Sequence, residues 1–199
     1  MSERNTMLTT KERILDAAES LMLEKSFHSV GLNEILAAVK VPKGSFYHHF
    51  ESKEQFGVEM LRHYVAAEYQ REAAWLHDKT QFPQALERMV RFLEAGLMKF
   101  VENGCRPICL VVKLCGEVAT FSTGMRQELH EGFSKWDALL ADTIREGQEQ
   151  GCMKAALDPD VTAALLGQLW LGAMLQAQVQ KNVNPLARAV TFMKTYLAV

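Results

Sequence analysis

The stretch that decides the fold is Val41-Pro42-Lys43-Gly44-Ser45-Phe46-Tyr47-His48-His49-Phe50-Glu51-Ser52-Lys53-Glu54. Pro42 separates a short apolar helix, which carries Ile35, Leu36 and Val39, from a second short helix that begins near Lys43. A longer amphipathic helix precedes both, so three helices are predicted within the first 50 residues, with a tight turn between the last two. This is the spacing of a helix-turn-helix, whose last helix lies in the major groove of DNA.

Side chains suited to a nucleic-acid contact gather in this segment. They are Lys43, Gly44, Ser45, Tyr47, His48 and Lys53. Lys43 offers a cation to a phosphate, and Gly44 allows backbone N–H groups to approach closely. Lys53 begins the following helix, where its charge opposes the helix dipole, and a phosphate at that place would explain the lysine. The alternative is an exposed helix end with solvated lysines, because short helix triplets are common in α proteins.

The overall composition is that of a folded globular chain of one or two domains. Its 199 residues are 48% hydrophobic and 23% charged, and the formal net charge is -2, so any nucleic-acid contact must be local. The first residues lack the apolar core of a signal sequence, and the most apolar later run, 165–177, is interrupted by Gln168 and Gln176. We therefore expect a cytoplasmic protein with no membrane partner.

Helical periodicity continues along the chain, whereas strand-like alternation and Asn-Gly or Asp-Gly hairpins are missing, which predicts an all-α fold. Residues 1–52 are expected to form a helix-turn-helix DNA-binding domain, and residues 53–199 a helical sensing and dimerisation domain. Residues 165–175 are apolar on every side of a helix, and a symmetric partner is the simplest cover for a second face. We therefore predict a homodimer through the last two helices, at 158–182 and 185–198.

The stretch from Thr10 to Phe56, with residues 41–54 at its centre, closely resembles the DNA-binding domain of TetR-family transcriptional repressors. The resemblance implies a homodimer that binds a palindromic operator and releases it when a ligand or chemical signal acts on the C-terminal domain. It also implies that the six residues named above contact DNA and that Phe50 packs, while His49 does either. Gly31 departs from the family, which often carries a threonine there that touches phosphate, although glycine still serves as a helix N-cap.

The cysteine spacing points to a thiol sensor. The four cysteines do not form a secreted disulfide framework and are expected to be free thiols. If Pro107 occupies the first helical position, Cys109 lies in the first turn, where a helix N-terminus favours the thiolate. Lys113 and Arg106 add positive charge, and Cys105 is close enough in sequence to resolve an oxidised Cys109. The other interpretation is a buried thiol that acts as a small hydrophobe.

A second, shorter resemblance supports the thiol. Residues 109–114 and 170–177 are similar to electrophile-responsive TetR-family repressors, of the kind that control N-ethylmaleimide reductase. One alternative is a noncovalent apolar effector held by Trp136, Trp170 or Met174.

Two other classes of function rank lower. The cysteine spacing lacks the paired pattern of zinc sites, so neither a metal nor a cofactor is predicted. A helical thiol enzyme is less favoured because His130 is the only obvious mid-chain partner for a catalytic cysteine. The sequence therefore predicts a repressor rather than an enzyme.

Overall fold

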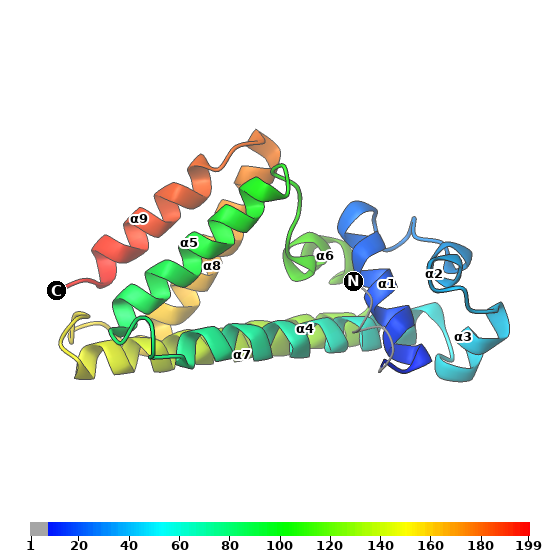
Figure 1. Ribbon diagram of the computed structural model, residues 1–199, viewed down its shortest axis with the longest axis horizontal. Coiled ribbons are helices and arrows are strands. Elements are labelled where there is room, and N and C mark those ends of the chain that lie inside the picture. Colours follow the sequence, from blue (N-terminus) through cyan, green and yellow to red (C-terminus); the bar gives the residue numbers. More distant parts are fainter. Residues whose placement is uncertain (1–7) are drawn as a thin grey trace. The chain divides into compact units, whose positions relative to one another are not determined.

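The computed structural model describes residues 8–199, and within that range the regular structure is helical apart from one isolated antiparallel bridge, Met153 to Ala198 (Figure 1). The helices of this range are α1 (Thr10–Glu24), α2 (Leu32–Val39), α3 (Lys43–His49), α4 (Lys53–His77), α5 (Ala85–Glu102), α6 (Leu110–Val118), α7 (Thr123–Glu149), α8 (Pro159–Gln180) and α9 (Asn184–Leu197). The all-α prediction is confirmed. Residues 1–7, where the sequence shows no apolar signal core, lie outside the described range.

The chain folds as two compact units. Of the described residues, unit 1 comprises 8–67 and Cys109–His130, and unit 2 comprises Glu68–Ile108 and Glu131–Val199. Unit 1 therefore holds α1 to α3, the first part of α4, α6 and the start of α7. Unit 2 holds α5, α8, α9 and the remainders of α4 and α7. None of the helices described in either unit combines the length and the apolar character that a membrane span requires.

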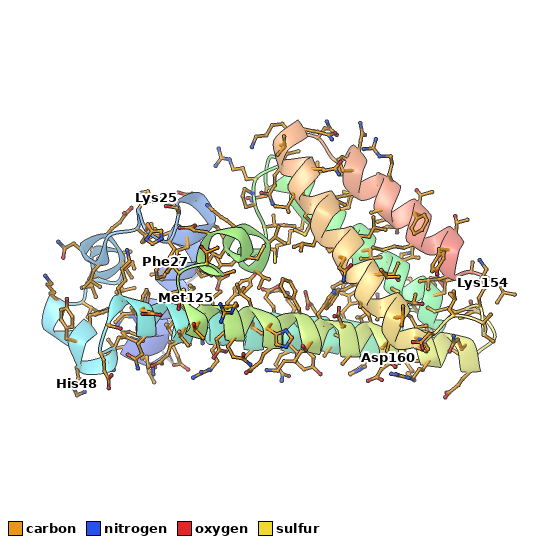
Figure 2. All side chains as sticks on the ribbon, turned by 180° about the vertical axis from the view of Figure 1, so that it is seen from behind. Lys25, Phe27, His48, Met125, Lys154 and Asp160 are labelled. Atoms are coloured by element: carbon orange, nitrogen blue, oxygen red, sulfur yellow. The ribbon has the colours of Figure 1, made fainter. Side chains whose placement is uncertain are left out.

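Unit 1 is built around aromatic side chains from the helix-turn-helix and α4. Phe46, Phe50 and Phe56 are each about 1% exposed, and their ring centres lie 5.0 to 5.3 Å apart. Gly57 leaves no room for a Cβ, because Phe27 and Met125 fill the space above it. Both side chains are labelled in Figure 2, where they lie next to each other. These contacts fix the start of α4 directly against the helix-turn-helix.

Unit 2 has its own core, formed between α5, α7, α8 and α9. Arg88 is fully buried there, and its guanidinium donates to the carbonyls of Phe82 and Pro83 and pairs with Glu146 at 2.7 Å. The Arg88 side chain thereby satisfies carbonyls of the loop before α5. Lys154 Nζ donates to the Tyr196 carbonyl at 2.9 Å, which ties the end of α9 to the loop that follows α7 (Figure 2).

Candidate functional site

A tight turn joins α2 to α3. Lys40 ends α2 in the left-handed conformation, with φ 56° and ψ 45°, and its N–H donates to the Ala37 carbonyl at 3.2 Å. Val41 N then donates to the Leu36 carbonyl at 3.0 Å, and Pro42, with φ -68°, is the N-cap of α3. The predicted helix-turn-helix is therefore present with the turn at residues 40–42.

The helix α3 has one buried and one exposed face. Phe46 and Phe50 point into unit 1. The opposite side carries two adjacent pairs of exposed residues, one helical turn apart. Those exposed residues are Lys43, Gly44, Tyr47 and His48. A Cβ on Gly44 would meet nothing within 4 Å, so the fold itself does not require glycine there. His48, labelled in Figure 2, points away from the unit. This face is open to a partner, and Ser45 lies half-buried at its edge.

Lys53 differs from Lys43 in its surroundings. Its ammonium donates to the carbonyls of Val30 at 3.0 Å and His28 at 3.3 Å, and it lies 5.2 Å from the centre of the Phe27 ring. The Lys43 side chain makes no hydrogen bond or ion pair within residues 8–199. Lys43 is therefore free to meet a phosphate, while Lys53 already holds the loop between α1 and α2.

Cys109 is the N-cap of α6 rather than a residue of its first turn. Its backbone is extended, with φ -128° and ψ 120°, and the helix begins at Leu110. The prediction that Pro107 opens this helix is wrong, because residues 106–109 are not helical. The physical reason is Tyr64 on α4, whose hydroxyl oxygen accepts a hydrogen bond from Leu110 N at 3.1 Å and so satisfies the first free amide of the helix.

The structure assigns Lys113 and Cys105, the predicted partners of Cys109, to different units. Cys109 is half-buried in unit 1, and Lys113 N donates to its carbonyl at 3.2 Å. The Lys113 ammonium instead donates to the Leu23 carbonyl of α1 at 2.7 Å. Cys105 lies in unit 2, in the left-handed conformation with φ 57°.

Burial raises the pKa of Cys115, which favours its neutral thiol. The neutral thiol is the less reactive form.

The helix α6 also contacts the loop between α1 and α2. Glu117, one turn after Lys113, accepts a hydrogen bond from His28 N at 3.2 Å. The α6 side chains of Lys113 and Glu117 thus bind one carbonyl and one amide at the two ends of a short segment, Leu23 to His28. Sequence reasoning missed Glu117, because nothing local in the sequence marks a contact with a loop 89 residues away.

The predicted pocket residues of unit 2 are packed side chains. The Trp136 ring lies 5.5 Å from that of Phe92, Trp170 packs over Gly96, and Met174 is 4% exposed. A shallow groove lies along α9. It is lined by Asn184, Ala187, Arg188, Thr191, Phe192 and Thr195. Within residues 8–199, no cluster of three or more His, Cys, Asp or Glu side chains is arranged to hold a metal ion.

Glu72 on α4 is a further residue that sequence reasoning missed. Burial raises the pKa of this carboxyl to about 7, although Arg71 and Lys99 act in the opposite direction. Nothing local in the sequence marks this burial.

An apolar stripe runs along the exposed side of α8. Its members are spaced four or six residues apart and share one helical face. They are Val161, Leu165, Leu169, Leu175 and Val179. On α9, the exposed rings of Phe192 and Tyr196 stack at 5.5 Å with an angle of 13° between their planes. Contiguous apolar surface of this kind marks an interaction site on a protein.

Two family models match the chain. The model described as bacterial regulatory proteins, tetR family, matches residues 14–60, and the model described as tetracyclin repressor-like, C-terminal domain, matches residues 85–193. The chain belongs to the TetR family of bacterial transcriptional regulators. It is a TetR-type transcriptional repressor, since the proteins and families that it matches are transcriptional regulators and not enzymes.

Individual relatives match over nearly the whole chain. The HTH-type transcriptional repressor NemR of Escherichia coli (strain K12) is 36% identical over 195 residues, which cover 98% of this chain and 97% of that protein. The HTH-type transcriptional repressor DhaR of Mycobacterium sp. (strain GP1) is 31% identical, covering 91% of this chain and 88% of its own length. The crystal structure of E. coli NemR in its reduced form superposes with a TM-score of 0.87, covering 96% of this chain and 98% of that one.

Proposed function

We propose that this repressor binds a palindromic operator as a homodimer in the cytoplasm, and that a thiol-reactive electrophile acting at Cys109 releases it. DNA binding is supported by the two faces of α3, one buried and one exposed. Its buried phenylalanines fix the helix, and its other face presents Lys43, Gly44, Tyr47 and His48 to a major groove. Lys43 contributes a phosphate contact, and Ser45 a hydrogen bond at the edge of the same face.

Lys53 remains in the proposed DNA contact set with a different role. Its ammonium holds the carbonyls of His28 and Val30 in the free protein, so a phosphate must compete with those two acceptors. Lys53 therefore contributes less to the salt dependence of DNA binding than Lys43 does.

The homodimer forms through α8 and α9, the helices that correspond to the predicted ranges 158–182 and 185–198. The exposed stripe of α8, with Leu165 near its start and Val179 at its end, would pack against the same stripe of a second copy across a two-fold axis. Phe192 of α9, which lines the shallow groove, adds exposed apolar area. A two-fold dimer also supplies the second α3 that a palindromic operator needs, about 34 Å from the first.

Cys109 is proposed as the sensing thiol because it is half-buried at the start of α6, the helix that also binds the α1–α2 loop. A group added to its sulfur would displace the start of α6. Lys113 and Glu117 then transmit the displacement to α1 and to the loop before α2. Cys105, four residues earlier in sequence, is proposed as the resolving thiol under oxidants.

The test is a gel-shift assay with the DNA upstream of the reading frame, at fixed salt, with and without N-ethylmaleimide. Specific binding that is lost on treatment, and retained by the treated Cys109→Ser variant, supports the full proposal. Binding that N-ethylmaleimide leaves unchanged keeps the operator-binding function and turns the search to a noncovalent apolar effector near Trp136, Trp170 or Met174. A protein that binds no DNA in this region overturns the operator assignment.

A further inference from the structure

The Tyr64 hydroxyl lies at the junction of α4 and α6 within unit 1. Tyr64 is 3% exposed, and its oxygen accepts the hydrogen bond from Leu110 N at 3.1 Å. Cys109, the N-cap residue, makes no side-chain cap bond of its own. Tyr64 therefore does for α6 what a capping side chain does for other helices, but from a neighbouring helix.

The Cys109 side chain is an electrostatic and hydrogen-bonding neighbour of the same hydroxyl. A phenol has one hydrogen to donate and two lone pairs. Because the oxygen already accepts from Leu110 N, its hydrogen is available to the Cys109 sulfur. Burial raises the pKa of Tyr64 well above its usual range, and the adjacent Cys109 thiol raises it further. The phenol consequently stays protonated and can act as a permanent donor.

We infer that Tyr64 is the positioning residue of the sensing thiol: it donates to Cys109 Sγ, favours the thiolate, and ties that sulfur to α4 through the Leu110 amide. This inference rests on the proposed role of Cys109. The other charged groups that bear on the pair are Glu19 of α1, which acts on Tyr64, and Lys113 of α6, whose ammonium is bound to Leu23. Because the Lys113 ammonium is bound to Leu23, Tyr64 is the donor left beside the sulfur.

Alkylation with iodoacetamide changes what Tyr64 can bind. The Cys109 thiol gives its proton to water, the thiolate forms a C–S bond to the methylene carbon, and iodide leaves with the C–I electron pair. The product is a neutral thioether, which is a weak acceptor. The Tyr64 hydroxyl then loses its charged partner inside a buried site, and the added acetamide group occupies the space between α4 and the start of α6. The hydrogen bond from Leu110 N to the Tyr64 hydroxyl is lost at the same time.

The experiment measures the rate at which Cys109 of the full-length protein reacts with iodoacetamide, from pH 6 to pH 10, by peptide mass spectrometry. The Tyr64→Phe variant keeps the ring and removes the hydroxyl. At pH 7 it is expected to react about tenfold more slowly than the wild type, because a hydrogen bond to the thiolate is missing. The two rates should converge near pH 10, where both proteins carry the thiolate. Tyr69→Phe, which changes a tyrosine of the same helix packed on the core of unit 2, is the matched control.

A Tyr64→Phe profile with the wild-type midpoint, whether its rates are equal or uniformly scaled, overturns the inference, since a purely structural role would leave the midpoint in place. If circular dichroism shows that the variant does not fold, the inference is tested instead on the pH-rate profiles of the wild-type cysteines. Cys109 of the wild type should then show a lower midpoint than Cys105 and Cys152 in the same digest, and a midpoint at or above theirs overturns the inference. These rates do not depend on DNA, so failure of iodoacetamide to release the operator counts against the proposed function alone.

Discussion

The Lys113 ammonium of α6 donates a 2.7 Å hydrogen bond to the carbonyl of Leu23, in the last turn of α1. The last carbonyls of a helix have no partner within it, and a cation there also interacts favourably with the helix dipole. The last turn of α1 contains no basic residue of its own. Lys113 supplies that charge from the helix that begins at the candidate sensing thiol, and burial lowers its pKa while Glu117 and Glu24 oppose the shift.

Replacing Lys113 should weaken the connection between α6 and α1. Lys113→Met keeps the length of the side chain and removes the donor, so the Leu23 carbonyl loses its partner. We expect the free energy of unfolding to fall by about 1 to 2 kcal/mol. We also expect protein fully alkylated at Cys109 to retain more operator binding than alkylated wild type. Urea denaturation and a gel shift measure the two effects.

The matched control is Lys135→Met, which removes an exposed lysine of α7. It should change neither quantity appreciably, because surface substitutions usually alter stability by less than about 0.5 kcal/mol. Full release of the operator from alkylated Lys113→Met protein would show that the signal does not pass through this contact.

Lys43 and Lys53 should separate into a DNA contact and a mainly structural contact. Lys43→Ala removes an exposed ammonium, so affinity should fall on every DNA sequence, and the slope of log K against log salt should become shallower by about 1 for each half-site. Lys53→Ala frees two carbonyls of the α1–α2 loop and should lower the free energy of unfolding by about 1 kcal/mol.

Fluorescence anisotropy at several salt concentrations gives the slopes, and urea denaturation gives the stabilities. An unchanged slope for Lys43→Ala would remove Lys43 from the phosphate contacts. A slope for Lys53→Ala as shallow as that for Lys43→Ala would show that Lys53 leaves its carbonyls for phosphate.

The sequence was sufficient to predict the helix-turn-helix because its signals are local. Pro42, the apolar spacing of α2 and the motif around Phe46 all act within a few residues, and the structure confirms the turn and the helices. The start of α6 was mispredicted because proline at a first helical position is a common pattern, whereas the deciding contact comes from Tyr64, 46 residues before Leu110.

Long-range contacts explain the other differences as well. Lys113 was expected to act on Cys109 because the two are one helical turn apart, yet its ammonium binds Leu23, 90 residues away. Side chains four positions apart can meet on a helix, but a buried carbonyl without a partner competes strongly for a lysine. Only packing of α6 on α1 brings that carbonyl within reach.

The exposed stripe of α8 predicts how the dimer should respond to charge. Leu165→Glu places a carboxylate within the apolar stripe, where it would be desolvated without a partner in the dimer. We expect the dimer to dissociate at least 100-fold more readily and operator binding to fall with it, because one α3 reads only a half-site. Light scattering after size exclusion measures the first effect, and the gel shift the second.

Gln70→Glu, at an exposed position of α4, adds the same charge outside the stripe and serves as the control. A Leu165→Glu protein that remains dimeric at low micromolar concentration would place the interface elsewhere.

Glu72 predicts a pH dependence of stability in unit 2. Burial raises its pKa to about 7, from 4.5 for an unperturbed glutamate, so the folded protein binds a proton more tightly than the unfolded chain. The stabilisation from that proton is fully present below pH 4.5 and is lost as the pH rises through 7, by about 3 kcal/mol in total. Glu72→Gln resembles the protonated form at every pH. It should therefore match the wild type near pH 4.5 and be more stable than it at pH 8.

Urea denaturation of both proteins at pH 4.5 and pH 8, at one protein concentration, measures this difference. Glu149→Gln removes an exposed carboxyl of α7 and should shift the two stabilities equally. If Glu72→Gln is no more stable than the wild type at pH 8, the Glu72 carboxylate is ionised in the folded protein at little cost. Its surroundings would then have to supply solvent or a cation. Arg71 and Lys99 are the cations that already favour its charged form, so changing each of them to Met would show which one does so.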